Sequence, residues 1–225
     1  MESGNLGGYR YRQGCQWGAL AFKNTDRRCT QSAEGDPKMF DAEKGAQVAG
    51  VLLSHAPNQT MDRIKLIKLM YFVDRQAFLE YGATISGDRM VSLPKGPVLS
   101  ETLNALKGAP AYSNEFTKWV VIPHEGYSYS LAAGADPDDA DLLSDADMEI
   151  IENVWDQFGK MDGFALVEWT HDPKNCPEWE NPDKSSIPIS LEKLAIALGM
   201  SNEEASQLVL ENDEAEGIRQ TLASL

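Results

Sequence analysis

The chain has 225 residues, of which 42% are hydrophobic and 24% charged, a balance typical of a globular protein. Its net charge of −15 is uneven, with +2 on residues 1–38, +1 on residues 39–110 and −18 on residues 111–225, which argues against direct nucleic-acid binding by the C-terminal half. No apolar run approaches the roughly 20 residues that span a bilayer, and the N-terminus lacks the apolar core of a signal peptide, so we expect a cytoplasmic protein with no membrane partner.

Residues 1–38 contain several glycines and no sustained helical or strand period, and we expect a poorly ordered leader. Regular structure is predicted from Met39, which is a candidate for the natural start of the protein. A first helix is predicted from Asp41, whose side chain can cap the N-terminus, to His55.

A long helix is predicted from a cap at Thr60 to about Tyr81, with Gly82 as the residue that ends it. Its two apolar stripes merge into one wide face, which favours a helix packed on more than one side at the centre of the domain. The remaining positions hold basic residues, which we expect to form a solvated rim: Lys65, Lys68 and Arg75.

Residues 88–93 predict a short strand. The run Lys95–Val98 predicts a turn after it, because Pro97 lacks an N–H donor and Gly96 precedes it. A helix is then predicted from a cap at Ser100 to its end at Gly108.

Two strand-like runs, residues 116–122 and 127–131, indicate a hairpin around a loop of about four residues. An acidic loop follows at residues 136–141. The run Ser144–Asp147 resembles a capping box, and it opens a helix that we expect to end at Gly159.

Residues 163–170 predict another short helix, and residues 169–182 a proline-rich loop. In the tail, Ser190 can cap a helix that ends at Gly199, and Ser201–Glu204 is a capping box for a further short helix. These helices could pack on the main domain or form a partner-binding appendage.

The elements together predict an α+β fold that is mainly α-helical with a small antiparallel sheet. We expect three parts: the leader at 1–38, a domain at 39–182 and a helical C-terminal extension at 183–225.

Catalytic and metal-binding motifs are missing from the sequence: it has no nucleotide-binding glycine loop, no nucleophile elbow and no zinc-protease motif. His171 and Cys176 could imitate a catalytic pair or two zinc ligands. An acidic field raises the pKa of a thiol, however, and no further ligands stand nearby. Two isolated polar residues in a loop are the plainer interpretation, and we expect no enzyme, no cofactor and no metal.

Three short motifs follow one another along the chain. The first is a Lys-Leu-x-Lys-Leu-x-Tyr-x-x-Asp pattern at residues 65–74, and the second is Gly-Pro-Val at residues 96–98. The third holds Thr170, His171, Pro177 and Trp179. Taken in this order, the motifs resemble the Panacea domain, also called the SocA-like domain, and Glu178, interposed before the tryptophan, is a small departure from the family pattern. The resemblance covers roughly residues 40–182.

This resemblance implies a non-enzymatic antitoxin of a bacterial or phage toxin–antitoxin pair, which neutralises a cognate toxin by direct binding. The alternative that it implies is a proteolytic adaptor that delivers the toxin to an ATP-dependent protease. The motif residues could stabilise the domain or contact the partner. We expect His171 and Trp179 to hold the proline-rich loop at residues 169–182 in place. The candidates are Lys68, Tyr71, Asp74, Lys95, Gly96, Pro97, Val98, Thr170, His171 and Trp179.

The acidic C-terminal half would suit a basic toxin, although acidity can also serve solubility alone. Two other classes are a hydrolase built on His171 and Cys176 and a DNA-binding autorepressor. No helix-turn-helix with a basic recognition helix supports the autorepressor.

Overall fold

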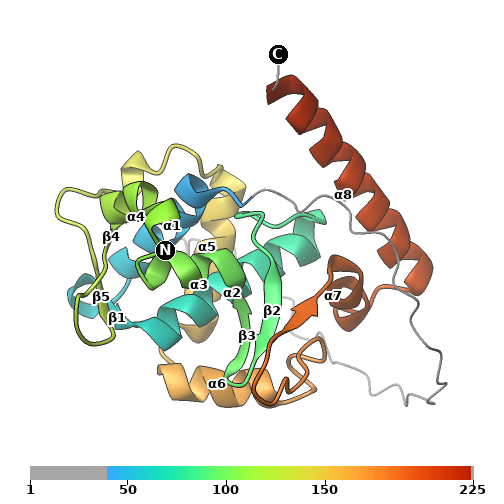
Figure 1. Cartoon of the computed structure of the whole chain (residues 1–225), viewed down its shortest axis with the longest axis horizontal. Helices are drawn as coiled ribbons and strands as arrows, with labels where there is room; N and C mark the ends of the chain where they lie inside the picture. Colours follow the sequence, from blue (N-terminus) through green and yellow to red (C-terminus); the bar gives the residue numbers. More distant parts are fainter. Residues whose placement is uncertain (1–39, 224–225) are drawn as a thin grey trace, which may run out of the picture. The chain divides into compact units, whose positions relative to one another are not determined.

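The computed structural model describes residues 40–223 (Figure 1). Over these residues eight α-helices accompany two three-stranded antiparallel sheets, which confirms the predicted mainly helical α+β fold. The leader expected at residues 1–38 lies outside the described residues. The helices are α1 (Ala42–Ser54), α2 (Arg63–Tyr81), α3 (Ser100–Leu106), α4 (Ser113–Trp119), α5 (Asp145–Phe158), α6 (Gly163–His171), α7 (Leu191–Ala197) and α8 (Asn202–Ala223). The strands are β1 (Thr60–Asp62), β2 (Met90–Leu93), β3 (Gly96–Leu99), β4 (Val120–Val121), β5 (Ser128–Leu131) and β6 (Ile187–Ile189).

Helix α2 is the centre of the fold, as predicted, and packs against α1, α5, α6 and β3 (Figure 1). It ends at Gly82, which has a left-handed φ of 71° that glycine adopts without strain. Its cap is Asp62, whose carboxylate accepts from the backbone N–H of Lys65 at 3.0 Å. The predicted cap Thr60 is wrong, because that residue begins β1, which pairs with β5.

The solvated rim predicted on α2 is also wrong for two of its three members. Lys68 is 1% exposed and Arg75 8% exposed, because each finds a partner inside the fold. Lys65 is half-buried, and its ammonium donates to the carbonyl of Gly159 at 2.6 Å.

The first sheet has the order β1-β5-β4, and its hairpin β4–β5 is shorter than predicted. Most of the run 116–122 is helical instead of extended, since α4 continues to Trp119. Phe116 and Trp119 stand three positions apart, so a helix turns both toward α1, where Gly50 leaves room for the indole. Burial of these two rings therefore outweighs the strand propensity of the run.

The second sheet has the order β3-β2-β6. The predicted turn at Lys95–Val98 is wrong, because Gly96–Leu99 forms β3 and the hairpin turns at Pro94 and Lys95. Pro97 sits in the edge strand opposite Ser92, with its carbonyl directed toward Lys68. The N and C=O of a strand residue point to the same side, so the missing N–H of Pro97 costs no bond to β2.

Helix α3 begins at Ser100, but the serine does not cap it. The carboxylate of Asp88, on the other side of the β2–β3 hairpin, accepts from the N–H groups of Glu101 at 2.9 Å and Thr102 at 2.7 Å. The start of α3 is therefore stabilised by a residue outside the helix.

The remaining caps follow the sequence. Asp41 caps α1, Ser144 and Asp147 form the capping box of α5, and Ser190 caps α7. The box formed by Ser201 and Glu204 opens α8, which is 22 residues long and not the short helix predicted. Residues 187–189, expected only as the start of the tail, pair with β2 as β6 and so attach the C-terminal region to the second sheet.

Candidate functional site

The three motifs of the sequence meet around α2. We call the resulting group the motif cluster. It comes from α2, β3, α6 and the loop after α6, and its members are Lys68, Tyr71, Arg75, Gly96, Pro97, Thr170, His171, Cys176, Glu178 and Trp179.

Lys68 joins the first motif to the second. Its ammonium donates to the carbonyl of Pro97 at 2.6 Å. A Cβ on Gly96 would lie 2.6 Å from that ammonium and 2.3 Å from Oγ1 of Thr170, so only glycine fits between these groups. Burial lowers the pKa of Lys68 to about 7, against the opposing effect of the Cys176 thiol.

Glu178 joins the first motif to the third. Its side chain is fully buried and accepts from the hydroxyl of Tyr71 at 2.6 Å and from Nε of Arg75 at 2.7 Å. Nη2 of Arg75 also donates to the carbonyl of Asn175 at 3.0 Å. A buried carboxylate costs free energy unless it is paired and hydrogen-bonded, and this one is both.

Arg75 and Glu178 were not among the predicted site residues. One signal was present, because Arg75 lies four and seven positions after Tyr71 and Lys68 and therefore on the same side of α2. Glu178 is the residue that departs from the family spacing before Trp179, and it supplies the carboxylate at the centre of the network.

Trp179 attaches the loop after α6 to the second sheet. Its indole N–H donates to the carbonyl of Leu93 at 3.0 Å, so the polar edge of the ring has a hydrogen-bond partner. The ring stacks on His171 with a centroid distance of 4.2 Å. Burial, and secondarily the charge of Lys68, lowers the pKa of His171, so the stacked imidazole stays neutral near pH 7.

Cys176 lies inside the cluster with 1% of its surface exposed. Burial, followed by the carboxylate of Glu178, raises the pKa of its thiol far above the ordinary value. A thiol that stays protonated is a poor nucleophile. Among the described residues no three His, Cys, Asp or Glu side chains gather closely enough to hold a metal ion.

Three predicted residues lie outside the motif cluster. Asp74 is buried, and its carboxylate accepts from the N–H groups of Ile85 and Ser86, each at 3.0 Å. Burial raises the pKa of Asp74 to about 6, although the donors at Ser86 lower it. Val98 packs in the apolar core, and Lys95 is exposed at the hairpin turn.

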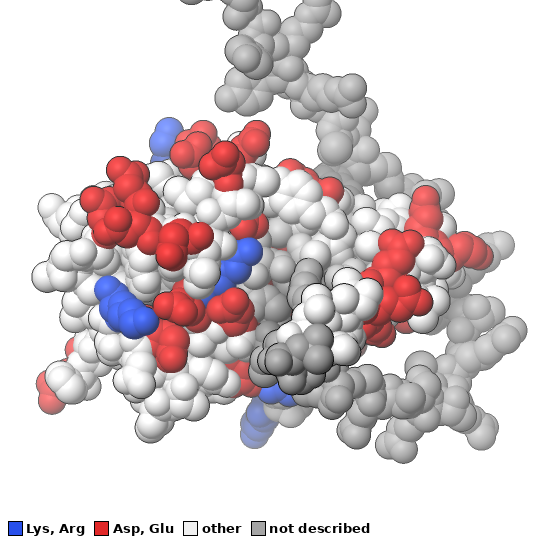
Figure 2. All heavy atoms as spheres, turned by 90° about the horizontal axis from the view of Figure 1, so that it is seen from above, with Lys and Arg blue, Asp and Glu red and all other residues white. Residues whose placement is uncertain are grey.

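Acidic side chains dominate the face shown in Figure 2, in keeping with the 35 Asp and Glu against 20 Lys and Arg of the chain. Several large apolar side chains are also exposed, and the most exposed among the described residues are Tyr127, Phe164, Leu210, Ile218 and Leu222. In the described part of the chain, no helix has the length and apolarity that a bilayer crossing requires.

One family model matches the sequence, over residues 66–180, and its description is "Antitoxin SocA-like, Panacea domain". No curated protein and no solved structure matches the chain. The matched region covers just over half of the 225 residues and contains the whole motif cluster. The chain therefore belongs to the SocA-like antitoxin family, and its Panacea domain is built around the buried contacts of Lys68 and Glu178.

Proposed function

We propose that the protein is an antitoxin that neutralises a cognate toxin by direct protein–protein binding. The observation that carries this proposal is the family match over residues 66–180, which includes every member of the motif cluster. The cluster supports a binding role, because most of its polar groups are already hydrogen-bonded inside the fold, as in the bonds from Lys68 to Pro97 and from Tyr71 and Arg75 to Glu178. Cys176 is buried and the pKa of its thiol is raised, so it is not an accessible nucleophile.

The ten motif residues divide by exposure. Seven are buried and would act by shaping the domain: Lys68, Tyr71, Asp74, Gly96, Pro97, Val98 and Thr170. Lys95 is exposed, and His171 and Trp179 are partly exposed. These three side chains are the motif residues that a toxin could touch without unfolding the domain.

The charge of −18 on residues 111–225 favours a basic toxin. We further propose that the protein acts in the cytoplasm of a bacterium or of a phage-infected cell, with no cofactor, no direct contact to nucleic acid and no membrane partner.

A proteolytic adaptor is the second candidate. It is favoured by the C-terminal region, since residues 181–225 lie outside the family match and yet continue into a 22-residue helix. Such a helix would provide a second docking element, for the protease, beside a toxin-binding domain.

Co-expression with the product of the adjacent gene tests the proposal. If the neighbour alone arrests growth, and this protein restores growth in a complex that co-purifies, direct neutralisation is supported. Recovery of growth with protease-dependent loss of the neighbour would support the adaptor instead. A harmless neighbour that does not co-purify contradicts both roles for that pair.

The rate of association adds a second measurement. Exposed charges are screened over about 8 Å at physiological ionic strength, so the on-rate of a complex steered by acidic residues falls as salt rises. An on-rate that is independent of salt would contradict steering by the acidic half.

A further inference from the structure

Helix α8 is attached to the domain by its first half. Ala205 is fully buried, Leu208 lies against Gly82, and the side-chain amide of Asn212 donates to the carbonyl of Gly82 at 2.6 Å. After Asn212 the pattern changes, since Ile218 is 61% and Leu222 65% exposed.

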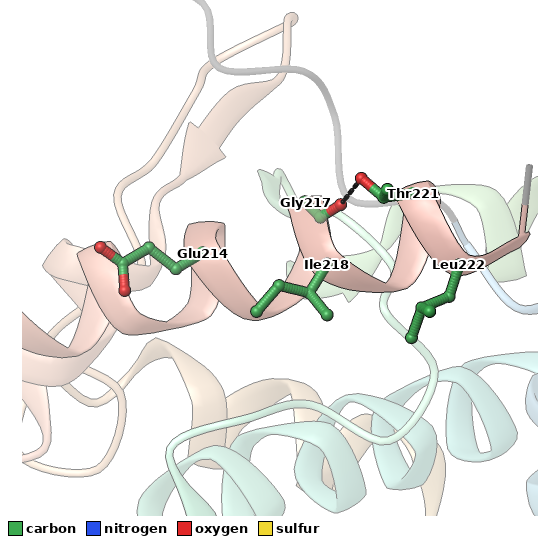
Figure 3. Close-up of a pocket in the computed structure, with 5 residues that line it drawn as sticks. All are labelled: Glu214, Gly217, Ile218, Thr221 and Leu222. Carbon is green, nitrogen blue, oxygen red and sulfur yellow. Dashed lines mark hydrogen bonds between the residues drawn. The ribbon is translucent and has the colours of Figure 1, made fainter.

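Two hollows follow one side of α8. The first is a groove of about 750 Å³ between the end of α2 and the start of α8, with Leu79, Tyr81 and Leu208 among its apolar residues. The second, of about 420 Å³, is lined by Glu214, Gly217, Ile218, Thr221 and Leu222, and Figure 3 shows Ile218 and Leu222 pointing to the same side of the helix.

The two hollows belong to one surface. Residues three or four positions apart lie on the same side of a helix. Gln207 and Glu211, which line the groove, are followed at such intervals by Glu214 and Ile218, which line the second hollow. We call this surface the α8 face. It consists of Leu79, Tyr81, Gln207, Glu211, Glu214, Ile218 and Leu222.

Carboxylates surround the apolar part of this face. The groove is lined by Glu80, Glu203, Glu204 and Glu211, the second hollow by Glu214, and no described Lys or Arg lines either one. A second copy of this chain would bring the same carboxylates against each other, which opposes self-association. A basic segment would meet charges of opposite sign, and its apolar residues would cover Ile218 and Leu222.

We propose that the α8 face is the docking surface for the toxin, and that it takes a basic amphipathic segment, with Lys or Arg side chains flanking a short apolar stripe. This inference rests on the proposed antitoxin function and adds to it the surface and the chemistry of the partner. It places the main contact outside the family-matched region, which ends at residue 180.

The test uses the full chain and the purified product of the adjacent gene. In the double variant Ile218→Gln and Leu222→Gln both exposed apolar side chains become polar in a residue type that favours helix. We expect its affinity for that protein to fall at least tenfold. The matched control, Val121→Thr with Phe164→Gln, removes two exposed apolar side chains from β4 and α6 and should change the affinity less than twofold.

A charge pair sharpens the test. Glu211→Lys with Glu214→Lys reverses the charge of the α8 face, and we expect a tenfold slower association at low salt. Glu152→Lys with Asp156→Lys makes the same change in net charge at two exposed positions of α5, and it should slow association less than threefold.

The outcomes separate the two proposals. If the wild-type chain binds and the Ile218/Leu222 variant binds equally well, the α8 face is not the docking surface, while the antitoxin function stands. If the wild-type chain does not bind, both proposals fail. A dimer of the isolated chain that this variant dissociates, or a gain in affinity on removal of residues 1–38, would identify another occupant of the face and overturn the inference.

Discussion

The motif cluster and the α8 face use the same kinds of residue in opposite ways. In the cluster, Glu178 is fully buried and receives hydrogen bonds from Tyr71 and Arg75. On the α8 face, Glu214 is exposed beside apolar side chains that stay uncovered. The family match includes the cluster and stops before α8. The residues that identify the family therefore form its scaffold, whereas the surface that we propose for the partner lies outside the matched region.

The largest effect should come from removing the buried carboxylate. Glu178→Gln keeps the shape of the side chain but leaves the charge of Arg75 without its partner, and loss of one member of a buried pair costs about 3–5 kcal/mol. Urea denaturation measures the change in the free energy of unfolding.

Glu180→Gln is the matched control, because Glu180 pairs with Lys193 at the surface, where its side chain is 59% exposed. Such pairs contribute about 0–1 kcal/mol. If Glu178→Gln and Glu180→Gln lower the free energy of unfolding equally, the buried pair stabilises the fold no more than the surface pair does.

Two glycines can be compared to separate the effect of close packing in the motif cluster from the effect of backbone strain. Gly96 and Gly134 have nearly equal φ angles of 94° and 89°, so an alanine at either position adds backbone strain of about 1–3 kcal/mol. Only at Gly96 does the new Cβ meet Thr170 and Lys68, which adds about 1–3 kcal/mol. Thermal unfolding measures the stability of Gly96→Ala and Gly134→Ala. Equal losses of stability would show that Thr170 and Lys68 move to make room for the new Cβ at Gly96.

The buried ammonium predicts a dependence on pH. The folded chain holds Lys68 with a pKa of about 7, while in the unfolded chain the group keeps its ordinary value of 10.5. The unfolded chain therefore binds more protons between these values, and stability rises with pH. Between pH 7 and 8, below the ordinary pKa of about 8.5 of an unfolded cysteine, the gain from Lys68 is about 1 kcal/mol.

Urea denaturation across this interval should show the rise in the wild-type chain and lose it in Lys68→Met. The exposed Lys107 supplies the control, as Lys107→Met should keep the slope. A slope that survives in Lys68→Met would assign it to another group.

The smallest effect on stability is expected at the α8 face. Ile218→Gln with Leu222→Gln should change the free energy of unfolding by less than about 0.5 kcal/mol, since both side chains are exposed. A loss of more than about 2 kcal/mol would mean that the stripe packs within the chain and is not free for a partner.

Local chemistry made much of the fold predictable. Asp41, Ser144 and Ser190 cap helices where the sequence places them, and Gly82 ends α2. Each of these residues acts on a backbone group within a few positions, so its effect is visible in a short stretch of sequence.

The errors share a different cause, which is contact between distant segments. Asp88 replaces Ser100 as the cap of α3, and the carbonyl of Pro97, which the edge strand β3 turns away from β2, is the acceptor for Lys68 of α2. Arg75 looks like a surface residue until Glu178 is placed beside it. Contacts of this kind determine which side chains meet in the motif cluster. A short stretch of sequence does not show them, because the partners lie far apart in the chain.

The pair formed by Arg75 and Glu178 also has a consequence for synthesis of the chain. The two residues are 103 positions apart. At the usual translation rate of about 5–20 residues per second, roughly 5–20 seconds pass between them. During that interval the central helix exists without its counter-charge, so the buried network of the domain stays incomplete until residue 178 has been added.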